Sequence, residues 1–168
     1  MIVDNNILSA LAKMERLNLL NQLFDEVATT TSVIEEVHRD EVAGYDFVVR
    51  IDEIKRYNGG WLEVTSLSEN EIESAEEIVD TSLSFTDAEC IALSISRDQP
   101  LLTDDGHVGE MAKQRGVEVW DLKLLVEACI HTEIIKKEEE LENLIKDLEK
   151  EDNYSFSEKD RKDLRERF

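Results

Sequence analysis

Five short apolar runs separated by longer helical segments are the feature of this sequence that most restricts its fold. The runs cover residues 1–4, 26–30, 61–64, 100–103 and 117–120. Each run contains Val, Ile or Leu and is too short for a stable helix, so the five runs predict buried β-strands. Strands that alternate with helices form a parallel sheet with helices on both faces. We therefore expect a three-layer α/β sandwich around a five-stranded parallel sheet.

Helical periodicity and cap signals divide the segments between the strands. The predicted helices cover residues 7–24 (broken near residues 16–18), 32–42, 45–57, 68–80, 86–98, 106–116 and 122–131. Three of them carry a Ser/Thr-x-x-Glu pattern, the capping box that satisfies the first N–H groups of a helix. These pairs are Ser32–Glu35, Ser68–Glu71 and Thr86–Glu89. Gly59, Gly60 and Gly116 predict helix ends.

The last part of the chain, residues 133–168, has helical patterns and no strand signal. Leu141, Leu144, Ile145 and Leu148 recur at intervals of three and four residues, so one stripe of this helix must be covered. The stripe either packs back on the preceding domain or serves self-association or a partner protein. We expect two parts, an α/β domain over residues 1–132 and a helical extension over residues 133–168.

The charge balance limits the classes of partner. Asp and Glu number 40 against 19 Lys and Arg, for a formal net charge of −21, and such a surface repels nucleic acid at long range. No stretch approaches the roughly 20 apolar residues of a membrane span. The opening MIVD has no signal-peptide pattern, so a cytoplasmic location is expected. Cys90 and Cys129 stand in apolar helical contexts and are predicted to be reduced and packed.

Acidic side chains stand directly after two of the predicted strands. Asp4 ends the first apolar run, and Asp104 and Asp105 follow the fourth. In an open parallel sheet, ligands bind beyond the carboxyl ends of the strands, where the winding direction reverses. If the first and fourth strands are neighbours, these three carboxylates converge on one crevice. Otherwise they are turn formers in a very acidic chain.

Two helical acids have apolar neighbours that are expected to face the sheet. Glu36 shares a helix face with Val33, Val37 and Asp40, and Asp87 shares one with Ile91. A carboxylate at the edge of the core is unfavourable unless it is paired or coordinated. The alternative for Asp87 is a helix-capping role, and for Glu36 a solvated flank.

An oxygen-only cluster of this kind suits a hard cation such as Mg²⁺ or Mn²⁺. The three histidines are isolated, and no Cys/His spacing typical of zinc sites is present. The sequence also lacks the phosphate-loop, dinucleotide-binding and nucleophile-elbow motifs. These absences disfavour nucleotide-dependent and nucleophilic enzymes and leave a divalent metal site as the sharper hypothesis.

Four segments, in order, resemble the motifs of PIN domains: IVDNNILSAL, TTTSVIEEV, FTDAECIALS and LLTDDGHVGEMAKQRGVEVW. The resemblance covers roughly residues 1–132, and the helical extension is compatible with some archaeal and bacterial members. It implies the strand order 3-2-1-4-5 and a metal-dependent ribonuclease of the toxin type. The implied metal-binding and catalytic residues are Asp4, Glu36, Asp87 and Asp105, while Asp104 binds metal, supports the site or turns the chain.

The same resemblance makes Asn6 and Thr103 polar supports of the site that contact the substrate. Two departures from the pattern are Asn5, where the family often has Ser or Thr, and the absence of an arginine shortly after the acid pair. This absence bears on substrate contacts and on activity.

The expected reaction is hydrolysis of RNA, in which Mg²⁺ or Mn²⁺ polarises the scissile phosphate and lowers the pKa of a bound water. Lys13 and Arg16, and also Lys113 and Arg115, lie on the helices that follow the first and fourth strands. They are candidates for binding single-stranded RNA, and otherwise they are solvated helix residues. Many PIN-domain proteins are toxins with a cognate antitoxin, others process RNA, and homodimers are common.

The main competing hypothesis is a catalytically degenerate PIN-like module that binds RNA or a protein partner. A receiver domain or a dehalogenase-like phosphatase is disfavoured, because the first strand and its loop, VDNN, offer one acid where those proteins need a pair.

Overall fold

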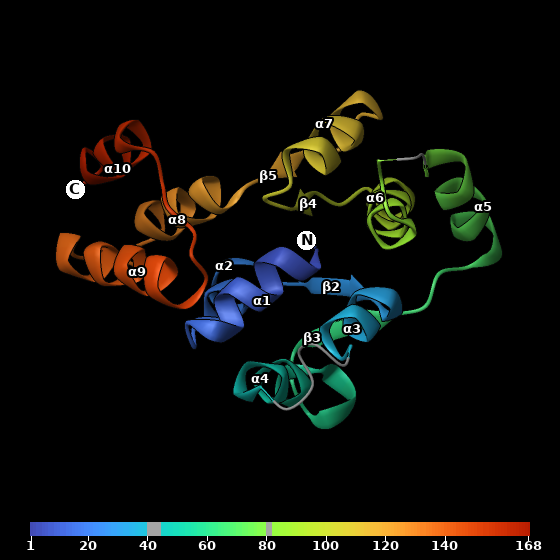
Figure 1. Ribbon diagram of the computed structural model, residues 1–168, viewed down its shortest axis with the longest axis horizontal. Helices are drawn as coiled ribbons and strands as arrows, with labels where there is room; N and C mark the ends of the chain where they lie inside the picture. The colour runs from blue at the N-terminus through green and yellow to red at the C-terminus, as the bar shows by residue number, and fades with distance from the viewer. Residues whose placement is uncertain (40–44, 80–81) are drawn as a thin grey trace.

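A five-stranded parallel sheet forms the centre of the protein (Figure 1). The computed structural model describes residues 1–39, 45–79 and 82–168. The strands are β1 (Ile2–Val3), β2 (Val27–Thr30), β3 (Leu62–Thr65), β4 (Leu101–Leu102) and β5 (Val119–Trp120), in the order β3-β2-β1-β4-β5. This order confirms the predicted α/β fold. It places β1 beside β4, with Ile2 paired to Leu101, and the winding direction reverses between these two strands.

Three of the strands, β1, β4 and β5, are only two residues long and therefore shorter than predicted. The chain leaves β1 at once because Asp4 is the N-cap of the next helix. Ladder hydrogen bonds nevertheless continue past the strand ends. The Asp4 N–H donates to the Leu102 carbonyl at 3.2 Å, and the Thr103 N–H donates to the Trp120 carbonyl at 2.9 Å. The residues that follow β1 and β4 are thus fixed by the sheet.

Helices connect the strands and complete the chain. They are α1 (Asn5–Lys13), α2 (Asn18–Leu23), α3 (Thr31–Val37), α4 (Asp46–Ile54), the 3-10 helix η1 (Arg56–Asn58), α5 (Glu69–Ile78), α6 (Phe85–Arg97), α7 (Gly106–Gln114), α8 (Leu122–His131), α9 (Glu138–Glu151) and α10 (Glu158–Arg165). The break between α1 and α2 confirms the prediction, and Glu15 there has a left-handed φ of 59°. The predicted helix ends at residues 40–42 and at residue 80, including Asp40, lie outside the described residues.

Two of the three predicted capping boxes are wrong. Thr30, the last residue of β2, caps α3 by accepting from the Val33 N–H at 3.2 Å, and Ser84 caps α6. In both helices the true cap lies two residues before the predicted one, because an N-cap needs an extended backbone and Ser32 and Thr86 are already helical. The Ser68–Glu71 box is confirmed with both of its hydrogen bonds.

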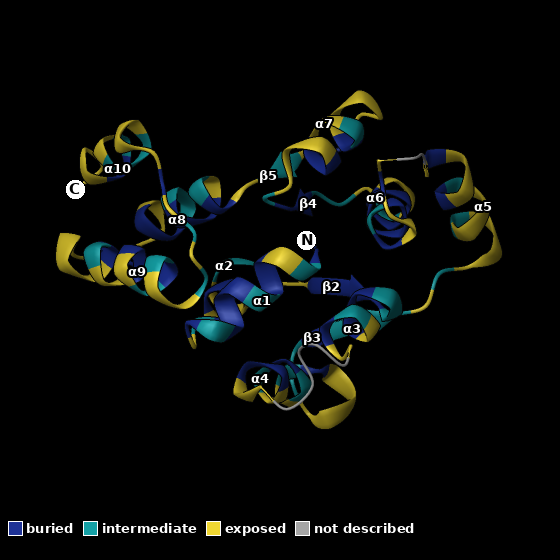
Figure 2. Cartoon of the chain, in the orientation of Figure 1, coloured by how far each residue is buried: buried dark blue, intermediate teal, exposed yellow. Residues whose placement is uncertain are grey.

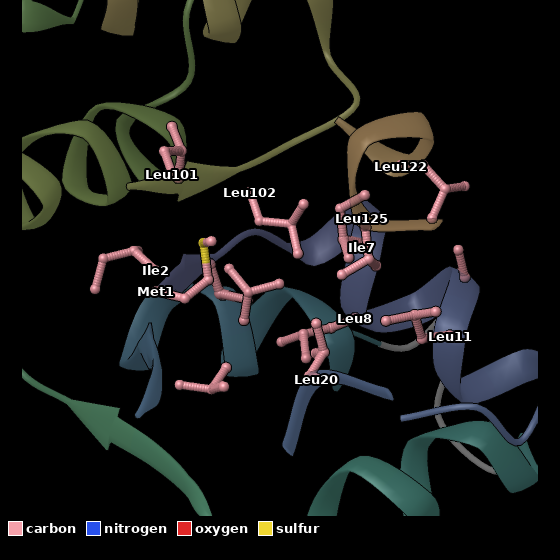
Figure 3. Close-up of a cluster of buried hydrophobic side chains, with 14 of the residues drawn as sticks. Met1, Ile2, Ile7, Leu8, Leu11, Leu20, Leu101, Leu102, Leu122 and Leu125 are labelled. Atoms are coloured by element: carbon pink, nitrogen blue, oxygen red, sulfur yellow. The ribbon is translucent and has the colours of Figure 1, made fainter. Parts of the chain in front are cut away.

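Two groups of helices cover the sheet. Helix α1 contacts both α3 and α4, whereas α6 contacts β1, β2 and β4 and also packs on α5 and α7. Because crossovers between parallel strands are right-handed, a sheet whose winding reverses carries these groups on opposite faces. Figure 3 shows part of the core, in which Ile2, Leu8 and Leu101 are fully buried. Cys90 and Cys129 are buried and unpaired, as predicted.

The C-terminal helices pack on the same core. Leu141, Leu144, Ile145 and Leu148 of α9 are 0–3% exposed and belong to the buried cluster that includes β1 (Figure 2). Helix α9 contacts α1, and α10 contacts α8. The predicted apolar stripe is therefore covered by the chain itself. No helix in the described ranges has the length and apolar composition needed to cross a membrane.

Gly59 and Gly60 end the α4–η1 segment for two different reasons. Gly59 closes η1 with a φ of 87°, which an L side chain rarely adopts. At Gly60 the space is missing, since a Cβ would lie 2.0 Å from the Ile54 carbonyl oxygen. The predicted helix end at this glycine pair is confirmed.

Candidate active site at the carboxyl edge of the sheet

Asp4 and Thr103 link the ends of the two central strands. Asp4 is 4% exposed. One of its oxygens accepts from the Ile7 N–H at 3.0 Å, and the other accepts from the Thr103 hydroxyl. The Thr103 oxygen in turn accepts from the Asp105 N–H at 3.2 Å. The carboxylate after β1 is therefore held in one orientation by the segment after β4.

Negative charge gathers around Asp4. Burial first, and then the charges of Asp87 and Asp104, raise the pKa of Asp4 to about 7 against the lowering effect of the hydrogen bonds from Ile7 and Thr103. Within the described residues, no Lys or Arg forms an ion pair with Asp4, Asp87 or Asp104. The strand edge thus holds carboxylates without an ion-pair partner among the described residues.

Asp87 and Asp104 reach this edge from two further elements. Asp87 lies in the first turn of α6, where the Ser84 hydroxyl donates to its carboxylate at 2.6 Å and accepts from its N–H at 3.1 Å. Asp104 follows β4 and accepts from the Leu122 N–H at 3.2 Å. Burial raises the pKa of Asp104, and the neighbouring charge of Asp121 adds to this effect.

Asp105 and Glu36 are engaged elsewhere. Exposed Asp105 caps α7 by accepting from the His107 N–H at 2.8 Å and the Val108 N–H at 3.1 Å. Glu36 is partly buried on α3 and lies 3.6 Å from the Arg39 guanidinium. The structure brings Asp87 and Asp104 within electrostatic reach of Asp4. Among residues 1–39, 45–79 and 82–168, no three Asp, Glu, His or Cys side chains are grouped closely enough to hold one metal ion in common.

The donor set nevertheless fits a hard divalent cation. The groups at the edge are carboxylate and hydroxyl oxygens, which are the ligands that Mg²⁺ and Mn²⁺ prefer. A buried carboxylate with a raised pKa and uncompensated neighbours gains most from a bound positive charge. It remains a prediction that one ion is bound jointly by Asp4, Glu36, Asp87 and Asp105.

The sequence model of the family DUF3368, described as a PIN domain, matches residues 1–166. The chain belongs to this PIN-domain family. PIN domains are generally nucleases and typically use divalent metal ions. The match extends through α9 and α10, so the family pattern includes the helical extension.

A solved structure has the same fold as this PIN domain. It is a PilT N-terminus domain protein from the hyperthermophilic archaeon Sulfolobus solfataricus P2, with a TM-score of 0.51 and 17% sequence identity. The superposition covers 76% of this chain and 91% of the archaeal chain. A comparison with curated protein sequences found no match.

The predicted substrate contacts of the PIN domain lie in different surroundings. Exposed Asn6 lines a pocket of about 250 Å³ beside Asp104, whereas Thr103 is buried against Asp4. Lys13 lies 2.6 Å from the Asp152 carboxylate, and Arg16 lies 3.4 Å from the Asp147 carboxylate.

The two cations near the end of α7 have different surroundings from Lys13 and Arg16. Lys113 and Arg115 are exposed, and Arg115 donates to the Met111 carbonyl of its own helix at 3.0 Å.

Sequence reasoning missed two features of the site. Glu89 is 8% exposed, and in the described part of the chain its Oε2 has no hydrogen-bond partner. The sequence does carry a signal for the burial of Glu89, which directly precedes the uninterrupted apolar run Cys90–Leu93, but the Thr86–Glu89 pattern favours a capping role. Asp152 and Tyr154 of the C-terminal segment also line the pocket beside Asp104. No local sequence pattern predicts their position at the pocket, because they come from a distant part of the chain.

Proposed function

We propose that this PIN domain is a metal-dependent ribonuclease that hydrolyses phosphodiester bonds in single-stranded RNA. The observation that carries the proposal is the uncompensated charge at the sheet edge. Asp4 is buried, and its raised pKa reflects both that burial and the neighbouring charges of Asp87 and Asp104. A fold that kept such a group without a ligand would be destabilised, so a retained buried acid points to a functional role.

Asp4 and Asp87 are the residues that would hold a Mg²⁺ or Mn²⁺ ion, with Asp104, Asp105 or Glu36 as further carboxylates. When bound, such an ion supplies Lewis-acid activation of a phosphodiester and hydroxide near neutral pH. The protein orients the donors. Thr103 fixes Asp4, the Leu122 N–H fixes Asp104, and Ser84 fixes Asp87. These hydrogen bonds hold the three carboxylates in defined orientations.

The physiological setting that we propose follows the family resemblance. The protein acts as a toxin with a cognate antitoxin or as an RNA-processing nuclease, and it functions as a homodimer. Size-exclusion chromatography with light scattering would test the dimer directly, and a monomer at micromolar concentration would contradict it.

The activity is tested with a fluorescent single-stranded RNA in the presence of Mn²⁺ or Mg²⁺. Asp4→Asn and Asp87→Asn are expected to lose cleavage. Asp160→Asn is a matched control, because Ser157 and Asp160 of α10 repeat the Ser84–Asp87 geometry, with the same 2.6 Å and 3.1 Å hydrogen bonds. Equal cleavage by wild type, Asp4→Asn and Asp87→Asn would show that the activity does not come from this site.

A second candidate, a catalytically degenerate module that binds RNA or a protein, is favoured by one observation. The Asp87 and Asp105 carboxylates already make helix-start hydrogen bonds in this structure. Such a module would bind RNA equally well with EDTA and with Mn²⁺, and it would not cleave in either condition. Cleavage that requires the metal and Asp4 excludes it.

A further inference from the structure

The segment between α9 and α10, residues 152–157, lies beside the candidate active site. We call it the α9–α10 connector; in Figure 1 it passes α8 on its way to α10. One pocket of about 250 Å³ has Asn6, Asp104 and Leu122 on the domain side and Asp152 and Tyr154 on the connector side. Asn6 comes three residues after the end of β1, and Asp104 comes two residues after the end of β4. The connector therefore forms a wall of a pocket at the carboxyl edge of the sheet.

The connector places a carboxylate on a lysine that faces this pocket. Asp152 lies 2.6 Å from the Lys13 ammonium, and the two side chains are 21% and 33% exposed. Lys13 also lines the pocket and lies 5.5 Å from the centre of the Phe47 ring. An ammonium group that binds one oxyanion in a half-exposed pocket can bind another, since carboxylate and phosphate oxygens make the same charge-assisted hydrogen bond. Asp152 thus holds the position that a phosphate of a bound strand would take.

A second contact places an aromatic ring at an acid of the site. Tyr154 and Asp104 line the same pocket, and the half-buried Tyr154 ring packs edge-on against Phe156 with the ring centres 5.1 Å apart. The Tyr154 N–H donates to the Leu148 carbonyl at 3.3 Å, and Asn153 before it has a left-handed φ of 55°. The connector thereby presents an anion and a planar ring, which are the two groups that a nucleotide would offer.

A third contact repeats the same pattern in the segment between α1 and α2. Arg16 lies 3.4 Å from Asp147 of α9. Both cations that follow β1 and were predicted to bind substrate are therefore paired with acids of the C-terminal extension. The pairs are partly exposed, and ion pairs of this kind are weak and screened by salt. A polyanion that offers several phosphates at once can displace them.

We infer that the α9–α10 connector is an internal competitor of RNA that occupies the strand's place on Lys13 and beside Asp104. This inference rests on the proposed function for the identity of the polyanion, single-stranded RNA. The bound strand displaces the connector from Lys13 and Asp104, while α9 stays anchored by Leu141, Leu144 and Leu148. The apparent association constant for RNA is the intrinsic constant multiplied by the fraction of molecules in which the connector is not seated.

The test measures the affinity for a fluorescent single-stranded RNA in EDTA, so that no cleavage occurs. Asp152→Asn is expected to tighten binding about 1.5-fold to fivefold, the range for removing one partly exposed ion pair. Glu142→Gln is the matched control, because it breaks a pair of the same 2.6 Å length, with Arg165, inside the extension. Lys13→Met is expected to weaken binding. Unchanged or weaker binding of Asp152→Asn overturns the inference, and so does unchanged binding of Lys13→Met.

A second measurement follows the connector itself. Backbone amides of residues 153–157 are expected to exchange hydrogen faster when RNA is bound, because the connector leaves its seat. Slower exchange would show that the connector belongs to the RNA-binding surface and would overturn the inference.

The outcome separates the two proposals. If Asp152→Asn binds RNA more tightly but neither protein cleaves with Mn²⁺, the ribonuclease function fails and the competition stands. If wild type and Asp152→Asn both cleave RNA and bind it with equal affinity, the ribonuclease function stands and the competition fails.

Discussion

Replacement of Asp4 by Asn is expected to stabilise the metal-free protein at neutral pH while it abolishes cleavage. Asn keeps the shape of the side chain, and its carbonyl oxygen can still accept from the Ile7 N–H. Asn and Asp are equivalent as helix N-caps within a few tenths of a kcal/mol. The oxygen that accepts from the Thr103 hydroxyl becomes an NH2 group, which can donate to the Thr103 oxygen instead. The main difference that remains is then the buried negative charge.

The magnitude follows from the pKa. Burial and the neighbouring acids raise the pKa of Asp4 from the usual 3.8 to about 7. At 1.36 kcal/mol for each pH unit, the charge destabilises the folded wild type by at most about 4 kcal/mol above pH 7. Relaxation of the surroundings reduces such penalties, and we expect a gain of about 2 kcal/mol for Asp4→Asn.

The sign of the pH dependence is fixed by the direction of this shift. Folded Asp4 binds its proton more tightly than unfolded Asp4, so the wild type loses stability as the pH rises from about 4 to about 7. Asp4→Asn lacks this loss. The difference in unfolding free energy between the two proteins should therefore be small at pH 4, grow up to pH 7 and stay constant above it.

Urea unfolding in EDTA, followed by circular dichroism at about pH 4.5, 6 and 8, measures this difference across the pH range in which it should change. Asp105→Asn is the control, because that carboxylate caps α7 at an exposed position and should change stability by a few tenths of a kcal/mol at every pH. A variant Asp4→Asn that is less stable than wild type at pH 8, or a difference that does not vary with pH, would refute the electrostatic reasoning.

Three further predictions concern the frame around the site. Thr103→Val removes the hydroxyl that bonds both Asp4 and the Asp105 N–H, and urea unfolding should show a loss of about 1–3 kcal/mol. Leu148→Ala, at a fully buried position of α9, should lose about 2–5 kcal/mol, whereas Leu124→Ala, 37% exposed, should lose far less. Gly60→Ala should prevent stable folding because its Cβ meets the Ile54 carbonyl, whereas Gly106→Ala, with nothing within 4 Å of the new Cβ, should fold normally in a thermal melt.

Each of these three predictions would be contradicted by a specific result. Wild-type stability of Thr103→Val would mean that the hydroxyl does not hold Asp4. Equal losses for the two leucine variants would mean that α9 does not unfold together with the sheet. A normal melting temperature for Gly60→Ala would remove the steric account of that glycine.

The sheet could be predicted from the sequence because its signal is local and repeated. Each strand is a short apolar run, and the runs alternate with amphipathic helices. The order of the strands came from the resemblance to PIN domains, since strand order depends on contacts between distant segments. The two misplaced helix starts have a local cause. Ser32 and Thr86 have suitable side chains, but Thr30 and Ser84 have the extended backbone that a cap requires.

The site was only partly predictable for the same reason. The positions of Asp4 and Asp104 after neighbouring strands followed from the rule for parallel sheets, and the structure brings them together with Asp87. The pairing of Lys13 with Asp152 could not be foreseen, because it joins residues that are far apart in an extension with no strand register. The burial of Glu89 depends on how α6 packs between its neighbours, which a helical period alone does not determine.

The central place of β1 has a consequence for biosynthesis. Strand β1 pairs with β2, which follows soon in the sequence, and with β4, whose pairing residues are Leu101 and Leu102. Domains fold as units once their segments have emerged. Until β4 emerges, Asp4 lacks the Thr103 hydroxyl, and Lys13 has no Asp152 partner until later still. The nascent chain therefore carries its acids as separate, solvated side chains. The candidate site is therefore completed late in synthesis, once β4 and then the α9–α10 connector have emerged.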